Sequence, residues 1–286
     1  MQKELKKFFR IIVFLLLLFD CKSITGPTTP EVIFVSTGDG PSDVCVNPTT
    51  NKIYVANAES DNVSVIDGSV DSVIATVEVG FWPMRVAVNP QTNRIYVANS
   101  LSDNVTVIDG ETNDTTTVAA GEMPSLICAN PNTNKIYVAN HGSVLVSSNV
   151  TVIDGETNDT ATVAVGDGPD AICVNTNTNR IYVANFNSRN VTVIDGETND
   201  TAIVAAGDTP YVMCVDTTTN KIYVVDHGGG SGSSGSVMVI DGETNNTTTV
   251  AIGNNPLAIS VNPTTNKVYV VNHNSDDVVV LYYPEE

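Results

Sequence analysis

One short segment recurs six times along the chain and constrains its fold more than any other feature. In its second copy the segment is Asn-Pro-Gln-Thr-Asn-Arg-Ile-Tyr-Val-Ala-Asn, residues 89–99. The full repeat around it, residues 80–120, contains four short runs rich in β-branched residues, separated by Gly, Pro, Asn and Asp. No helical spacing of apolar residues occurs within it. Each repeat is therefore predicted to form four short antiparallel strands joined by tight turns.

The spacing of the repeats indicates how these four-stranded units are arranged. Each repeat opens with a glycine that is followed three residues later by a proline, and successive opening glycines lie 41 to 46 residues apart. This period is typical of the blade of a β-propeller. The two longest copies carry their extra residues at one place, after the second strand, at 141–148 and 227–235. Insertions confined to one loop fit a radial repeat with a fixed core. The opening glycines are Gly38, Gly80, Gly121, Gly166, Gly207 and Gly253.

The two ends of the chain predict how the ring closes. The sixth copy stops after its third strand, residues 278–281, and a strand-like run at residues 32–35 precedes the first copy. We therefore predict an all-β, six-bladed propeller of 24 strands, with four antiparallel strands in each blade. The N-terminal strand is expected to complete the last blade, which would leave the ring without open edges.

The repeated motif also resembles a known family. Ile-Tyr-Val-Ala-Asn followed by Asn-Val-Thr-Val-Ile-Asp is similar to the YVTN-type β-propeller repeat, and the resemblance covers residues 31–286. Relatives of this kind occur in archaeal surface-layer proteins and in exported bacterial proteins, and many have seven blades rather than the six counted here. The resemblance implies a propeller outside the cytoplasm. It implies no reaction, because propellers serve unrelated functions.

The N-terminal residues read as an export signal. Four basic residues within the first ten precede a continuous apolar run at 11–19, which is too short to span a membrane as a helix. Cys21 follows directly and resembles the lipidated first residue of a bacterial lipoprotein, although the preceding Asp20 replaces the usual small residue. We predict a signal at 1–21, a tether at 22–30 and a propeller at 31–286. The alternatives are a soluble secreted form and an uncleaved anchor.

The charge of the chain limits its partners. The whole chain has a formal charge of −19, and residues 1–20 carry four basic and two acidic residues, so the remainder carries −21. Such a surface repels phosphate backbones, which argues against a nucleic-acid partner. It fits basic partners, bound cations or a solubilising surface with no specific partner.

Four cysteines occupy one position of the repeat, four residues after the blade's proline. Ala87 and Ser260 fill this position in the other two blades. A ring of thiols around the axis would suit a metal, but free exchange with Ala and Ser favours a small buried residue where the inner strands crowd together. These cysteines are Cys45, Cys128, Cys173 and Cys214.

Departures from the repeat mark a candidate ligand site on the face where strand two joins strand three. Apart from Lys22, six of the nine basic residues after residue 20 belong to the repeat itself, at the opposite face. The two others and several large side chains fall on the loops around the channel, where aromatic and Arg residues favour recognition. The predicted ligand-binding residues are Trp82, Arg85, Met123, Phe186, Arg189 and Tyr211.

Two patterns leave a metal open as an alternative. The three histidines, His141, His227 and His273, share one repeat position after the second strand, and three histidines suit zinc if they converge. Asp109, Glu111 and the equivalent residues of other turns place oxygens at alternate positions, as calcium ligands often do. An Asp that caps a tight turn explains the same residues. We therefore expect no cofactor, with zinc or calcium as the alternatives.

These observations predict a non-catalytic binding or scaffold propeller, exported and held at the cell envelope by a lipid on Cys21. Its partner would be an envelope protein or a small molecule, and the chain would be a monomer. One alternative is a metal-assisted lyase or hydrolase at the channel mouth, which would need unlike polar residues to converge. A structural surface-array subunit is the other, and it would need a self-complementary lateral surface.

Overall fold

The computed structural model describes residues 32–143, 147–228 and 234–282, and it is built entirely of strands and turns. Val35–Glu286 form one compact unit. The predicted signal, the lipidation site Cys21 and the tether lie outside the described residues. Within the described part, no helix is both long enough and apolar enough to cross a membrane.

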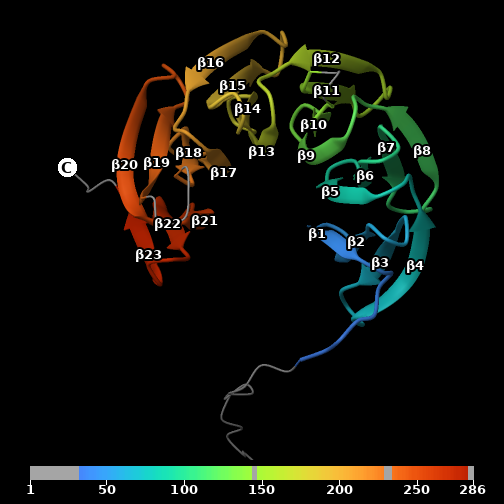
Figure 1. Cartoon of the computed structure of the whole chain (residues 1–286). Coiled ribbons are helices and arrows are strands. Elements are labelled where there is room, and N and C mark those ends of the chain that lie inside the picture. Colours follow the sequence, from blue (N-terminus) through green and yellow to red (C-terminus); the bar gives the residue numbers. More distant parts are fainter. Residues whose placement is uncertain (1–31, 144–146, 229–233, 283–286) are drawn as a thin grey trace, which may run out of the picture. The chain divides into compact units, whose positions relative to one another are not determined.

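The strands form six antiparallel sheets, each made of consecutive strands (Figure 1). These sheets are the blades of a six-bladed propeller. We number them by their order in the chain. Blade 1 contains β1 (Pro41–Asn47), β2 (Lys52–Asn57), β3 (Asn62–Asp67) and β4 (Ser72–Glu78); blade 2 contains β5 (Pro83–Asn89), β6 (Arg94–Asn99), β7 (Asn104–Asp109) and β8 (Thr115–Ala119); blade 3 contains β9 (Pro124–Asn130), β10 (Lys135–Asn140), β11 (Asn149–Asp154) and β12 (Thr160–Ala164). Blade 4 contains β13 (Pro169–Asn175), β14 (Arg180–Asn185), β15 (Asn190–Asp195) and β16 (Thr201–Ala205); blade 5 contains β17 (Pro210–Asp216), β18 (Lys221–Asp226), β19 (Ser234–Asp241) and β20 (Thr247–Asn254); blade 6 contains β21 (Pro256–Asn262), β22 (Lys267–Asn272) and β23 (Asp277–Leu281).

The first strand of each blade lies innermost, and neighbouring first strands pack against one another in chain order (Figure 1). Five apolar clusters fill the spaces between consecutive blades. The tyrosine of the second strand anchors each interface: Tyr54, Tyr96, Tyr137 and Tyr182 are fully buried, and Tyr223 nearly so. Burying aromatic side chains of this size supplies much of the energy that holds the blades together.

A repeated set of hydrogen bonds joins blades 1 to 5 in succession at the face opposite the predicted ligand site. Asn47, at the end of β1, is fully buried, and its Nδ2 donates to Oδ1 of Asn93 in blade 2 over 2.8 Å. The carbonyl oxygen of Asn93 accepts from the Gly110 amide, whose own carbonyl accepts from Nζ of Lys52 in blade 1. We call this set the inter-blade bridge.

Glycine is required at position 110 because a Cβ there would lie 2.3 Å from Oδ1 of Asn93. The bridge therefore explains the Asn-Pro asparagine, the basic residue and the Asp-Gly turn of the repeat together. Equivalent bonds join blades 2 to 3, 3 to 4 and 4 to 5, donated by the pairs Asn89 and Arg94, Asn130 and Lys135, and Asn175 and Arg180.

The bridge is broken between blades 5 and 6. Asp216 replaces the donating asparagine, and a carboxylate has no N–H to offer. Oδ1 of Asn266, which would accept this bond in blade 6, is buried without a hydrogen-bond partner among the described residues. The sequence change thus leaves one interface with an unsatisfied polar atom, which costs free energy.

The structure differs from the prediction for the last blade. Residues 32–37 form no strand and the sixth sheet has three strands, so the described residues hold 23 strands rather than 24. The predicted N-terminal closing strand is therefore not formed. In each described sheet the paired strands follow one another in the chain, whereas this pairing would link opposite ends of the chain.

The facing sides of blades 1 and 6 are correspondingly uncovered. Tyr269 is 38% exposed although its counterparts in the other blades are buried, and Val271 and Val44 are also exposed. None of the five apolar clusters in the described residues joins blade 6 to blade 1. Exposed strand faces of this kind are normally covered in a native sheet.

Restoring the missing donor should stabilise the protein. Asp216→Asn is expected to raise the free energy of unfolding by about 0.5–1.5 kcal/mol, because its Nδ2 would satisfy Oδ1 of Asn266. Urea denaturation of the two proteins measures the change.

The matched control is the converse substitution one blade earlier. Asn175→Asp removes the donor to Asn220 and is expected to lower the free energy of unfolding by about 1–3 kcal/mol. Equal effects of the two substitutions, or a loss of stability in Asp216→Asn, would contradict the role assigned to the bridge.

Candidate ligand-binding site

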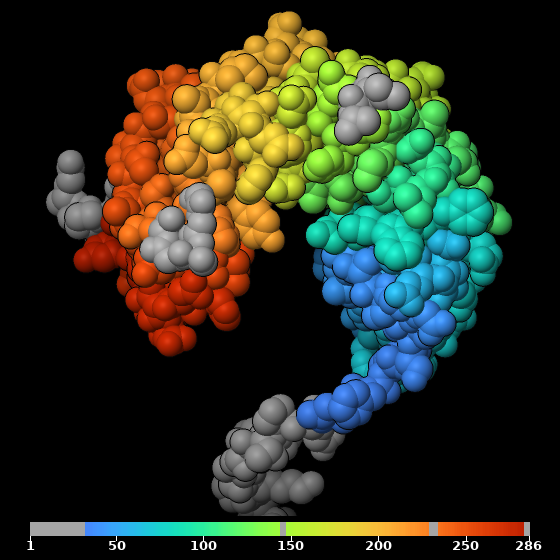
Figure 2. Space-filling model, in the orientation of Figure 1, coloured from blue at the N-terminus to red at the C-terminus, as the bar shows by residue number. Residues whose placement is uncertain are grey.

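The candidate site lies where the inner strands meet, in a cavity of about 400 Å³ that we call the axial pocket. The space-filling view shows the blades around an open central space, which continues to the outside between blade 1 (blue) and blade 6 (red) (Figure 2). One position of the repeat dominates the lining: the residue directly after the proline that opens the first strand. Five of the six residues at this position line the pocket: Met84, Ser125, Asp170, Tyr211 and Leu257.

These residues differ in chemistry although the frame around them is nearly identical from blade to blade. In the first blade the position holds Ser42, whose hydroxyl donates instead to the carbonyl of Pro83 over 2.7 Å. The proline pairs with the last residue of the second strand, and the residue after the proline is skipped in the register, as in a β-bulge. The repeated frame therefore presents a set of unlike side chains to a single cavity, as a specific binding site requires.

Arg85 and His141 add basic groups to the axial pocket. Arg85 is half-buried, and its Nη1 donates to the carbonyl of its neighbour Met84 over 3.0 Å. Burial raises the pKa of the Asp170 carboxyl, and His141 partly offsets this effect. A carboxyl whose charge is disfavoured, near two basic groups, gives the pocket varied hydrogen-bonding capacity.

A second cavity of about 480 Å³, the apolar pocket, adjoins the axial pocket. The two share Met84, Ser125 and His141 in their linings. We call the combined space the cleft. Both volumes lie in the range of small-molecule sites. The remaining lining of the apolar pocket consists of Trp82, Ser100, Leu101 and Met123.

Two of these large side chains are held in a backbone conformation that suits glycine. Trp82 has φ 56° and Met123 has φ 54°, whereas blades 1 and 4 use Gly40 and Gly168 at the same position, with φ 61° and 66°. A left-handed conformation costs a side chain about 1–2 kcal/mol. Strain of this kind concentrates at functional sites, where a side chain is kept for what it contacts.

Aspartates of the preceding blade support this conformation. Oδ1 of Asp61 accepts from the amide of Trp82, and Oδ1 of Asp103 accepts from the amide of Met123, over 2.8 and 2.9 Å. Both aspartates are themselves in the left-handed region, which Asp tolerates better than most residues. These hydrogen bonds fix the loops that carry Trp82 and Met123.

The structure brings together four of the six residues predicted for the ligand site and separates two. Trp82, Met123, Arg85 and Tyr211 line the cleft. Phe186 and Arg189 line neither pocket, and Arg189 forms an exposed ion pair with Asp208 over 3.3 Å. The lining also contains Met84, Ser125, Asp170 and Leu257, which are not among the six residues predicted from the sequence. The signal that marks them is the variability of the position after the proline.

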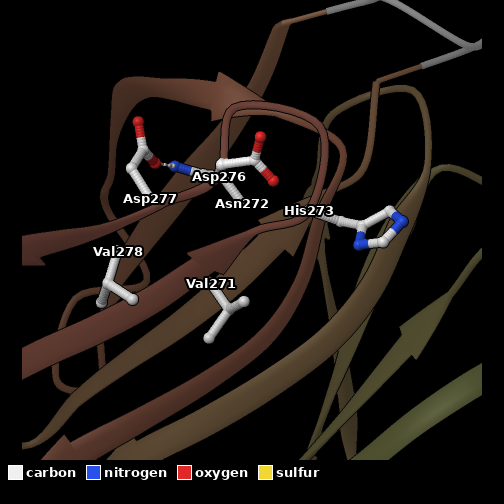
Figure 3. Close-up of a pocket in the computed structure, with 6 residues that line it drawn as sticks. All are labelled: Val271, Asn272, His273, Asp276, Asp277 and Val278. Carbon is white, nitrogen blue, oxygen red and sulfur yellow. Dashed lines mark hydrogen bonds between the residues drawn. The ribbon is translucent and has the colours of Figure 1, made fainter.

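The three histidines lie in different surroundings. His141 lines the cleft, and His227 makes an edge-to-face contact with Tyr211, with ring centroids 5.7 Å apart. Figure 3 shows His273 in blade 6 with its ring directed away from Asp276 and Asp277, and Nδ2 of Asn272 donates to Oδ1 of Asp277 over 2.7 Å. Among the described residues, no three His, Cys, Asp or Glu side chains lie close enough to hold one metal ion.

The aspartates of the Asp-Gly turns cap those turns. Oδ1 of Asp109 accepts from the amides of Glu111 and Thr112 over 2.8 and 3.1 Å, and Asn113 follows with φ 63°. These backbone hydrogen bonds lower the pKa of Asp109. The same geometry recurs at Asp154, Asp195 and Asp241.

The four blade cysteines are free thiols that pack against the apolar clusters. Burial raises the pKa of Cys45, Cys128 and Cys214 to about 12 and that of Cys173 well above its ordinary value. Since a thiolate is the reactive form of cysteine, these residues have the character of small core side chains.

Comparison with known proteins yields a similarity of fold. No family model matches the chain, and no curated protein matches its sequence. Among solved structures, the hydrazine synthase of Kuenenia stuttgartiensis is similar to 88% of this chain and 79% of its own, with a TM-score of 0.68 and 18% sequence identity. At this identity the likeness supports the propeller fold alone.

Because Oδ1 of Asp103 accepts a hydrogen bond from the Met123 amide, two substitutions of Asp103 should lower the stability of the protein by different amounts. Asp103→Ala is expected to lower the free energy of unfolding by about 1–2 kcal/mol, because it loses the bond to the Met123 amide and places Ala at φ 51°. Asp103→Asn keeps both an acceptor oxygen and tolerance of this φ, so its loss should be smaller. Urea denaturation that shows equal losses would contradict this account.

The raised pKa of the four half-buried thiols predicts that they react slowly in the folded protein. The four blade thiols should react only slowly with Ellman's reagent at pH 8 while the chain is native, and all four should react rapidly once guanidinium unfolds it. Absorbance of the released thionitrobenzoate measures both states, with a Cys21→Ser chain as the background. Rapid labelling of any blade cysteine in the native protein would contradict the burial.

Proposed function

We propose that this chain is a non-catalytic binding propeller whose ligand occupies the cleft. The proposal rests on a contrast between the residues that build the blades and the residues that line the axial pocket. The positions that build the blades repeat almost unchanged, whereas the position after the proline varies and brings five unlike side chains to one cavity. The strained placement of Trp82 and Met123 beside that cavity supports the same role.

The setting of this function is also part of the proposal. The YVTN-like motif, the N-terminal basic and apolar run and Cys21 support an exported member of that repeat family, held at the cell envelope by a lipid. The partner we propose is a small molecule or an envelope protein, and the strongly acidic composition argues against a nucleic acid. Replacement of Cys21 by Ser should move the protein from the membrane fraction to the soluble fraction.

A thermal-shift screen of small molecules and short peptides tests the binding role. A ligand at 100 times its Kd stabilises the native state by about 2.7 kcal/mol, which is readily measured. Ser125 lines both pockets, so Ser125→Trp should fill the cleft and abolish the shifts. Thr49→Trp, on the exposed turn at the other end of the blade, is the control. Shifts that survive in Ser125→Trp would place binding elsewhere and contradict the proposal.

One observation favours an enzyme, a lyase or hydrolase, as a second candidate. Arg85, His141, Asp170 and Tyr211 come from four different blades to one pocket, and burial raises the pKa of Asp170. Acid and base residues with shifted pKa values are common in active sites. Recovery of a bound ligand unchanged after long incubation supports the binding role. Conversion that stops in Asp170→Asn supports the enzyme.

A further inference from the structure

The cleft combines two chambers of different chemistry. The apolar pocket presents Trp82, Leu101 and Met123, all exposed to solvent to an extent unusual for such residues. The axial pocket presents Arg85 and Asp170, and the chambers meet at a shared lining. A ligand that fills both needs an apolar group and a polar group separated by a short distance.

Arg85 forms no ion pair with an acidic side chain among the described residues. The described residues contain two ion pairs, Arg189 with Asp208 and Lys221 with Asp241, and neither includes Arg85. In the described part of the protein, Arg85 is without an ion pair although the chain contains 32 acidic residues and 13 basic ones. A guanidinium carries five N–H donors, and its one hydrogen bond among the described residues goes to the Met84 carbonyl. Most of its donors therefore remain for a ligand.

The neighbouring groups favour an anion over a cation at this place. His141 lines the same pocket and adds a second potential donor. Asp170 is the acidic residue of the pocket, and its burial disfavours the charged form. Because the surrounding charge is strongly negative, selective capture of an anion depends on a local donor, and the planar fork of Arg85 matches a carboxylate.

We propose that the cleft binds an amphipathic carboxylate, with its aromatic or branched apolar group between Trp82, Leu101 and Met123 and its carboxylate on Arg85. The proposal rests on the binding role of the cleft given above. Two sources share this chemistry: a free arylalkyl carboxylic acid and the C-terminus of a peptide that ends in a hydrophobic residue. In either case the apolar group of the ligand supplies affinity, and Arg85 favours the charged carboxylate over an uncharged analogue.

The test uses three probes and the intrinsic fluorescence of the purified full chain. Trp82 is the single tryptophan, so its emission reports on the apolar pocket directly. The probes are N-acetylphenylalanine, its uncharged amide and 3-phenylpropionate, each titrated to about 10 mM and checked by calorimetry. The acid and the amide differ in charge and have nearly the same size.

The acids should bind more tightly than the amide by a factor on the order of ten or more, the worth of a charge-assisted hydrogen bond. Arg85→Gln should remove this preference and leave the weak binding of the amide unchanged. Arg189→Gln, which alters the other arginine of this face, should change neither. Tighter binding of N-acetylphenylalanine than of 3-phenylpropionate would indicate a peptide C-terminus, and the reverse would indicate a free acid.

Three results would overturn the inference. These are equal binding of acid and amide, no binding of any probe, and a preference for the acid that persists in Arg85→Gln. The binding role itself is judged separately by the library screen and Ser125→Trp. Cleft-dependent hits that are neutral or cationic would leave that role standing while the carboxylate proposal falls.

Discussion

The inter-blade bridge is the interaction on which the rest of the structure depends. A buried asparagine and a basic residue of one blade meet an asparagine and a glycine carbonyl of the next, and the exchange repeats at four interfaces. Each partner needs the others: a buried amide without its acceptor costs free energy, and any side chain on the glycine would collide with the asparagine. Most of the repeated polar residues are accounted for by this architecture rather than by a ligand.

The bridge also sets where variation is tolerated. It lies at the Asn-Pro and Asp-Gly turns, whereas the cleft lies at the opposite ends of the inner strands. Substitutions after the opening proline therefore leave the hydrogen bonds between blades intact. Because of this separation, the repeated blades can present five unlike side chains to a shared cavity. The rigid blades also hold Trp82 and Met123 in their strained backbone conformation.

Among the described residues, the bridge is absent between blades 5 and 6 and between blades 6 and 1. Asp216 removes its donor, the sixth blade has no Asp-Gly turn, and the faces of blades 1 and 6 expose apolar residues that are buried elsewhere. The groups of the bridge are nevertheless present at both ends: Asn262 and Lys267 stand at the donor positions, and Asn51 and Gly68 at the acceptor positions. Blades 1 and 6 therefore carry the hydrogen-bonding groups that join neighbouring blades elsewhere in the ring.

The sequence by itself determined the six blades and the approximate positions of their strands and tight turns, because these follow from local patterns of β-branched residues, Gly, Pro and Asn that repeat six times. It also marked Trp82, Arg85, Met123 and Tyr211 as departures from the repeat. Only the tertiary structure showed that Met84, Asp170 and His141 join them, that Phe186 and Arg189 do not, and that residues 32–37 form no closing strand. These outcomes depend on which blades face one another across the axis, and a local pattern does not encode distances between residues so far apart in the chain.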